Sequence, residues 1–197
     1  GDFSNRLSGA IEFAEKCKSL NKKFIFVLGN HDYYSSNYSS VVNFLKENYP
    51  KNALLDDNHI KIQDKIFVGG TLFTNFRSNS PLTSPEVLLQ SQKDAEQSIY
   101  DFDQIMIGSD HRTITANDYI ELFKKYHENI MKFKDQDNVI VITHFPPHLA
   151  CLDPYWGAHP VASALNPYFI NDLDIKGFKL WIAGHTHTSV DTVVDGC

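Results

Sequence analysis

The chain has 197 residues and a mass of 22.4 kDa, which suits one domain better than two. Hydrophobic residues make up 42% and charged residues 21%, so the composition is that of a globular protein and excludes a disordered one. Eighteen basic and 24 acidic side chains give a net charge of −6. This charge predicts no broad attraction to nucleic acid or anionic lipid, so an anionic substrate would need local groups such as metal ions.

Two further exclusions follow from the apolar runs and the cysteines. The longest apolar runs, 24–28 and 139–142, are too short to cross a bilayer, which excludes a membrane-spanning protein for this stretch. Cys17, Cys151 and Cys197 are odd in number and show no paired spacing. This argues against a disulfide scaffold or a thiolate zinc site, and it favours a reducing compartment, which we expect to be the cytoplasm.

Helical spacing of apolar residues and turn signals predict four helices, over residues 4–20, 41–49, 85–100 and 115–133. Ser4 and Ser84 are the expected N-caps of the first and third, and Pro50 stops the second. Short apolar runs predict strands at 24–28, 60–62, 65–68, 139–142 and 179–183. The buried strands are continuous apolar runs interspersed with helices, which indicates an α/β class.

Both ends of the sequence look internal to a longer domain. Residue 1 is Gly, and the methionines are Met106 and Met131 only. The β-branched run 190–194 is followed by Asp195-Gly196, a strong hairpin-turn signal whose returning arm is not in the sequence. We therefore expect strands to be missing at both ends; the alternative is a processed protein with frayed termini.

Three of the predicted strands are each followed closely by a histidine. His31 comes after 24–28, His144 after 139–142, and His185 with His187 after 179–183. Ligand sites of open α/β sheets gather beyond the carboxyl ends of strands, so we expect these side chains to converge. Gly1-Asp2, ahead of the first helix, reads as the end of another such strand.

Each piece has an ordinary structural explanation when taken alone. Gly29-Asn30-His31-Asp32 could be only a turn, and His144 could be a hydrogen-bonded edge histidine. Taken together they favour a metal site, because each unpartnered buried imidazole nitrogen costs about 1–3 kcal/mol and a pair of divalent cations would partner them all. Imidazole, carboxylate and amide ligands without thiolate suit Zn, Mn, Fe or Co, and two such ions can clamp a phosphoryl group.

Four motifs occur in the order of the calcineurin-like metallophosphoesterases, which the sequence resembles over residues 1–187: Gly1-Asp2, Gly29–Asp32, Thr143-His144 and Gly184–His187. Ala164–Phe169 resembles the small bacterial and phage branch of that family. Asn5, which precedes Arg6, differs from the acidic residue of the protein Ser/Thr phosphatases. The resemblance implies one domain over 1–197 with a two-sheet α/β/β/α sandwich, incomplete at both termini.

The resemblance also implies roles for these residues. Asp2 would bridge two divalent metals, expected to be Mn, Fe or Zn; Asn30, His144 and His185 would complete one site, and His187 would serve the other. His31 would contact the phosphoryl oxygens and protonate the leaving group, with Asp32 orienting its ring. A metal-bridging hydroxide would attack phosphorus in line.

One family motif is missing from its expected place. The resemblance implies an Asp-x-His motif on a strand ahead of Asp2, where this sequence has only Gly1. A catalytic metal usually has three protein ligands, so we expect the site served by His187 to be incomplete here.

Four further residues are candidate substrate contacts: Arg6, His148, Trp156 and His159. The ordinary alternatives are a surface ion pair for Arg6, a surface histidine for His148, and a lid without a substrate role for the loop that holds Trp156 and His159. We expect hydrolysis of a phosphomonoester or phosphodiester, with nucleic acid only as a possible substrate. The alternative is a weakly active or inactive binding module with the same fold.

Overall fold

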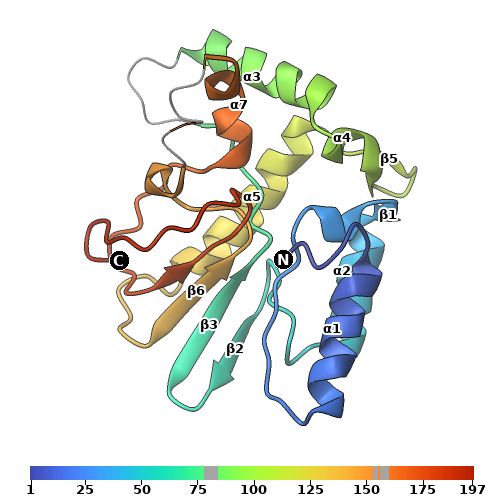
Figure 1. Ribbon diagram of the computed structural model, residues 1–197, viewed down its shortest axis with the longest axis vertical. Coiled ribbons are helices and arrows are strands. Elements are labelled where there is room, and N and C mark those ends of the chain that lie inside the picture. Colours follow the sequence, from blue (N-terminus) through green and yellow to red (C-terminus); the bar gives the residue numbers. More distant parts are fainter. Residues whose placement is uncertain (78–83, 153–154, 156–159) are drawn as a thin grey trace.

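The computed structural model describes residues 1–77, 84–152, 155 and 160–197, without the side chains of 160–164. Its centre is a four-stranded sheet in the order β2-β3-β6-β7 (Figure 1). The strands are β2 (His59–Ile62), β3 (Lys65–Gly70), β6 (Val139–Thr143) and β7 (Trp181–Ile182). β3, β6 and β7 are mutually parallel, whereas β2 forms the predicted hairpin with β3. Three carboxyl strand ends therefore meet at one edge of the sheet.

Four helices form at the positions that the apolar spacing predicts. They are α1 (Leu7–Ser19), α2 (Tyr38–Asn48), α3 (Pro85–Ser98), which lies beyond the end of the sheet next to α7 (Pro160–Phe169), and α5 (Ala116–Met131). α5 lies behind β3 and β6 in Figure 1, and its Tyr126 packs so close to Gly70 that a Cβ there would lie 2.2 Å from the ring. Glycine at that position thus allows the helix to approach the strand.

The helix starts show which cap predictions hold. Ser84 accepts a hydrogen bond from the backbone N–H of Val87, with Pro85 in the first turn, as predicted. The prediction for Ser4 is wrong: α1 begins after Arg6, and Ser4 Oγ instead donates to the Arg6 carbonyl at 2.7 Å. Ser4 therefore stabilises the turn ahead of the helix, not the helix itself.

A second, smaller sheet lies in the order β1-β4-β5, built from β1 (Ser36–Asn37), β4 (Ile105–Ile107) and β5 (Arg112–Thr113). The short α4 (Asp101–Gln104) leads into β4, and two 3₁₀ turns, η1 (His31–Tyr33) and η2 (Leu149–Cys151), follow strand ends. α7 (Pro160–Phe169) precedes β7. The mixed α/β class with two sheets is thus confirmed.

Two predicted strands are not formed as expected. Residues 24–28 are largely buried but make only one isolated bridge, Phe26 with Ala53, because their neighbour in space is the irregular segment after α2. Residues 190–194 are coil, although the turn after them does form. Asp195 and Gly196 both have positive φ, and Val194 and Cys197 exchange backbone hydrogen bonds of 2.9 and 3.0 Å across it.

The core beneath the carboxyl ends of β3, β6 and β7 is aromatic. Phe73 lies 4.7 Å from Tyr119 between ring centroids, and Phe145 lies 5.9 Å from Tyr168; all four are fully buried. Phe145 also packs against the His185 ring at 4.0 Å. The core therefore extends to one of the candidate ligands.

No helix in the described ranges is both long and apolar enough to cross a membrane.

Candidate metal centre and active site

The parallel register of the sheet brings the strand-end histidines together. His144 follows β6, and its backbone N–H donates to the Gly70 carbonyl at the end of β3 at 3.0 Å. Its carbonyl accepts from the Gly184 N–H at 3.0 Å, which places the loop of His185 directly beside it. Of the four histidines predicted to converge, the structure brings His144 and His185 into contact, and His31 and His187 line the cavity beside them.

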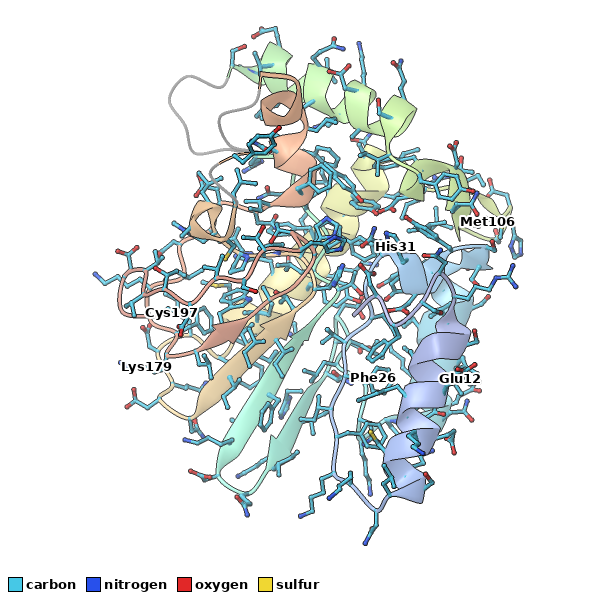
Figure 2. The ribbon with its side chains drawn as sticks, in the orientation of Figure 1. Glu12, Phe26, His31, Met106, Lys179 and Cys197 are labelled. Carbon is cyan, nitrogen blue, oxygen red and sulfur yellow. The ribbon has the colours of Figure 1, made fainter. Side chains whose placement is uncertain are left out.

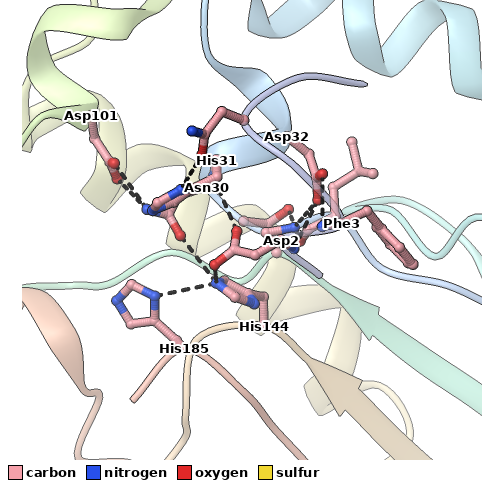
Figure 3. A network of polar contacts seen from close by, with 12 residues as sticks. Asp2, Phe3, Asn30, His31, Asp32, Asp101, His144 and His185 are labelled. Carbon is pink, nitrogen blue, oxygen red and sulfur yellow. Dashed lines mark hydrogen bonds and ion pairs between the residues drawn. The ribbon is translucent and has the colours of Figure 1, made fainter. Parts of the chain in front are cut away.

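Three donor groups from three other chain segments surround the Nε2 ring nitrogen of His144 (Figure 3). His144 Nε2 lies 3.1 Å from Asp2 Oδ2, 3.0 Å from Asn30 Oδ1 and 3.2 Å from His185 Nδ1. Ligand atoms of Asp2, His144 and His185 all lie within 4.8 Å of one another. Segments more than 140 residues apart in the sequence thus present one compact set of donors.

These donors fit a divalent cation better than they fit one another. His144 Nε2 carries at most one proton, yet three lone-pair atoms face it, so one hydrogen bond cannot satisfy all of them. His185 Nε2 and His144 Nδ1 are buried without a hydrogen-bond partner among the described residues. A cation at this point would neutralise the lone pairs, and the mixture of imidazole, carboxylate and amide oxygen suits a borderline metal.

The protonation states also suit metal binding. Burial would raise the pKa of Asp2, but the hydrogen bond and charge of His144 outweigh it and lower this pKa to about 2. Burial lowers the pKa of His185 well below its usual value, and the neighbouring His144 adds to the effect. Asp2 is therefore an anion and His185 a neutral imidazole near pH 7, which are the ligating forms.

The backbone is strained where the candidate ligands sit. Asp2, His185 and His187 have φ of 54°, 70° and 55°, in the left-handed region that non-glycine residues rarely occupy. Gly29 packs against the carboxylate of Asp2, so a Cβ there would lie only 1.9 Å from Asp2 Oδ1. The glycine is thus required for the carboxylate to reach the donor set.

His31 lies close to the middle of the molecule, beyond the end of the central sheet (Figure 2). Its Nδ1 is 2.8 Å from Asn5 Oδ1, an acceptor, so Nδ1 carries the proton and donates. Its ring stacks on Tyr34, with centroids 4.6 Å apart. Asn5 and Tyr34 therefore fix the ring, and Nε2 is the nitrogen left for a substrate.

The expectation that Asp32 orients the His31 ring is wrong. The Asp32 carboxylate accepts hydrogen bonds from the backbone N–H groups of Asp2 at 2.9 Å and Gly29 at 2.9 Å, and also from those of Phe3 and Ser4. Burial raises the pKa of Asp32, opposed by the bond from Gly29. Asp32 therefore ties the segment of Asp2 to the loop of Asn30 and does not serve as the ring's partner.

The remaining candidates fall in different places. His187 is exposed and lines the same 330 Å³ cavity as Asp2 and His31, but it is outside the group of donors that lie within 4.8 Å. Arg6 is exposed and does not line that cavity. His148 lines a separate 650 Å³ cavity, and its Nδ1 accepts from the Ala150 N–H at 3.1 Å. Trp156 and His159 lie outside the described residues.

Comparisons with known proteins agree with this geometry. The family model of the calcineurin-like phosphoesterases matches residues 1–189, nearly the whole chain. The chain belongs to the calcineurin-like phosphoesterases. It is also similar to "Uncharacterized protein L509" of Acanthamoeba polyphaga mimivirus, at 23% identity over 222 residues, covering 100% of this chain and 73% of the relative. No solved structure matches it significantly.

One motif-like triplet of this phosphoesterase lies away from the site. Asp57-Asn58-His59 is spelled Asp-x-His, but Asp57 pairs with Lys46 and the His59 ring packs on Phe133 at 5.0 Å. Its side chains are thus engaged elsewhere, so it does not replace the Asp-x-His motif that the resemblance implies ahead of Asp2.

The group that holds Asn30 in this phosphoesterase carries no signal in the sequence. The Asn30 amide Nδ2 donates to both carboxylate oxygens of Asp101, at 2.9 and 3.0 Å. Tyr168, part of the stretch that resembles the bacterial and phage branch, donates to Asp101 at 2.6 Å. Nothing in the sequence around Asp101 marks it, because it begins the short helix α4 and lies 71 residues from Asn30.

We expect Gly29→Ala to weaken binding of Mn²⁺ at least tenfold, as an order of magnitude, because the added Cβ displaces the Asp2 carboxylate. Isothermal titration with Mn²⁺ measures this. Gly196→Ala is the control: it strains a positive φ of 86°, but no atom lies within 4 Å of the added Cβ. A folded Gly29→Ala protein with unchanged affinity would contradict the role given to this contact.

Proposed function

We propose that this protein is a metal-dependent hydrolase of phosphomonoesters or phosphodiesters, with His31 donating a proton to the leaving group. The observation that carries the proposal is the convergence of Asp2, Asn30 and His185 on His144 Nε2, next to a cavity that His31 lines. A site of this kind pairs a cation-binding donor set with an acid–base group, which hydrolysis of a phosphate ester needs.

Asp2, Asn30, His144 and His185 would hold one divalent ion, and His187 with Asp2 would contribute to a second. Cations bound there would neutralise the phosphoryl oxygens and lower the pKa of water for in-line attack. None of the described residues that line the cavity is a lysine or arginine. The chain's own residues therefore supply ligands and a proton, and not the positive charge.

His31 can supply the proton that the leaving-group oxygen needs when its bond to phosphorus breaks. Water adds to phosphorus, the bond from phosphorus to the leaving-group oxygen breaks, and that oxygen takes a proton. Because Asn5 holds Nδ1–H, the protonated ring presents Nε2–H as the donor, and the stack on Tyr34 keeps the ring plane fixed. The ring then recovers its proton from the attacking water.

Hydrolysis of p-nitrophenyl phosphate and of its bis ester by the natural protein tests the proposal. We expect turnover with added Mn²⁺ and its loss after treatment with a chelator, because no lysine or arginine among the described residues lines the cavity to neutralise the phosphoryl oxygens. Release of p-nitrophenol measures it, and re-addition of Mn²⁺ is the control for reversibility. No turnover by the folded protein with Mn²⁺, Fe²⁺ or Zn²⁺ would instead favour a binding module with the same fold.

The roles of the two histidines separate by measurement. His31→Ala should lower kcat by about 10²–10⁴-fold while the metal content stays near normal, because His31 acts on the leaving group. His185→Ala should lose metal, because its Nδ1 belongs to the donor set. Metal content is measured by elemental analysis after dialysis. Equal loss of metal in both variants would refute the division of roles.

A further inference from the structure

The cavity over the site has aromatic side chains beside His31. Its volume of 330 Å³ suits a small organic group, and Tyr34 and Tyr100 line it next to His31. Tyr168 and Phe169 also line it, and they pack on the ring of the candidate ligand His185 at 5.8 and 5.6 Å between centroids. A substrate held by its phosphoryl group at the candidate ligands would therefore extend its leaving group along aromatic side chains.

The ring of His31, the proposed proton donor, is the first of three rings that contact one another in sequence toward the surface. His31 stacks on Tyr34 at 4.6 Å, and Tyr34 meets Tyr100 edge to face at 5.7 Å between centroids. Tyr34 is buried and its hydroxyl donates to Asp101 at 2.6 Å, so it is fixed. Tyr100 is 60% exposed. The outermost ring is thus rigidly supported yet open to an incoming aromatic group.

The charges of the cavity select against further anionic groups. The described lining contains the carboxylates of Asp2 and Asp101 and no lysine or arginine. A second phosphate on the leaving group would find no lysine or arginine among these residues to pair with. The leaving group that fits is uncharged and offers a flat apolar face.

We propose that the leaving group is a nucleoside, whose base stacks on Tyr100. This rests on the proposed phosphoesterase activity. Tyr100 lies two ring-to-ring steps, of 4.6 and 5.7 Å, from the ring beside the scissile bond, which leaves room for a sugar between phosphoryl group and base. Any base can stack on an aromatic side chain, so the site should prefer substrates that have a base but should not distinguish one base from another.

Adenosine 5′-monophosphate and ribose 5-phosphate form the test pair, because they share the phosphoryl group and the leaving alcohol and differ only in the base. With Mn²⁺, we expect kcat/KM for the nucleotide to exceed that for the sugar phosphate by about tenfold. Tyr100→Ala should bring this ratio close to one, and Tyr100→Phe should keep it. Leu20→Ala, an exposed apolar residue outside the cavity, is the matched control and should leave the ratio unchanged.

Binding of adenosine alone separates this proposal from the phosphoesterase activity. Isothermal titration should detect adenosine with the wild-type protein and with Tyr100→Phe, and much weaker binding with Tyr100→Ala. Equal kcat/KM for both substrates, or adenosine binding that Tyr100→Ala does not change, would overturn the stacking site while leaving the hydrolase intact. No hydrolysis of these two substrates, of p-nitrophenyl phosphate or of its bis ester would overturn the proposed function, whatever adenosine does.

A second inference rests on a different observation, the fully buried carboxylate of Asp101. This carboxylate accepts both hydrogen bonds of the Asn30 amide and the hydroxyl protons of Tyr34, Tyr119 and Tyr168. In the Asn30 side-chain amide, the nitrogen Nδ2 donates hydrogen bonds and the oxygen Oδ1 accepts them. Because Asp101 accepts from Nδ2, it requires that Oδ1 point the opposite way, toward His144.

We propose that Asp101 is a positioning residue that presents the Asn30 carbonyl oxygen to the metal. It touches neither substrate nor metal and acts through the amide alone. Partners that orient a metal ligand in this way typically change metal affinity 10–100-fold when replaced.

Asp101→Asn should weaken Mn²⁺ binding, measured by titration, by about 10–100-fold. Tyr119→Phe is the matched control: it removes another hydrogen bond to the same carboxylate but leaves the Asn30 pair, so it should lower the melting temperature and keep the affinity within about threefold. In an Asn30→Ala background, Asp101→Asn should have no further effect on affinity. If Asp101→Asn does not fold, Asp101→Glu takes its place, because a side chain longer by one methylene keeps the charge but displaces the carboxylate that accepts from Asn30 Nδ2 at 2.9 and 3.0 Å. Equal weakening by the variant and the control, or no weakening by either, would overturn the proposal.

Discussion

The site depends on one electrostatic constraint: three lone-pair atoms converge on His144 Nε2, and a single proton cannot satisfy them. Such a cluster is costly in an apolar surrounding unless a cation neutralises it. The surrounding structure holds the atoms in place all the same. Gly29 lets the Asp2 carboxylate approach, and Phe145 packs against the His185 ring. The fold thus maintains a donor arrangement whose favourable partner is a metal ion.

Two buried carboxylates hold this arrangement from opposite sides. Asp32 accepts backbone N–H groups of the segments at residues 2–4 and at Gly29, and so joins two strand-end loops. Asp101 accepts side-chain donors from Asn30 and three tyrosines, and so joins the loop of Asn30 to α5 and α7. Each is satisfied by several hydrogen bonds, which is the condition under which a buried carboxylate is tolerated.

Positive charge and apolar contact are divided between different parts of the cavity. The candidate ligands offer donor atoms for cations, and Tyr34 and Tyr100 offer ring faces, while the described lining has no lysine or arginine. With a net charge of −6, the protein as a whole does not attract anions either. Recognition of a phosphate ester by this chain therefore has to combine a bound metal with contacts to the uncharged part of the substrate.

The sequence by itself determined the α/β class, most helices and the β2–β3 hairpin, because apolar spacing and turn residues act locally. It also indicated that His144 and His185 would meet, because residues that follow parallel strands of one sheet lie at the same edge, whereas Asp2 and Asn30 were assigned to the site by the family resemblance. Only the tertiary structure decided that Asn5, and not Asp32, holds His31, and that Asp101 holds Asn30. Asp101 lies 71 residues from its partner, and a hydrogen bond over such a separation leaves no spacing in the sequence, since it exists only once helices and loops have packed together.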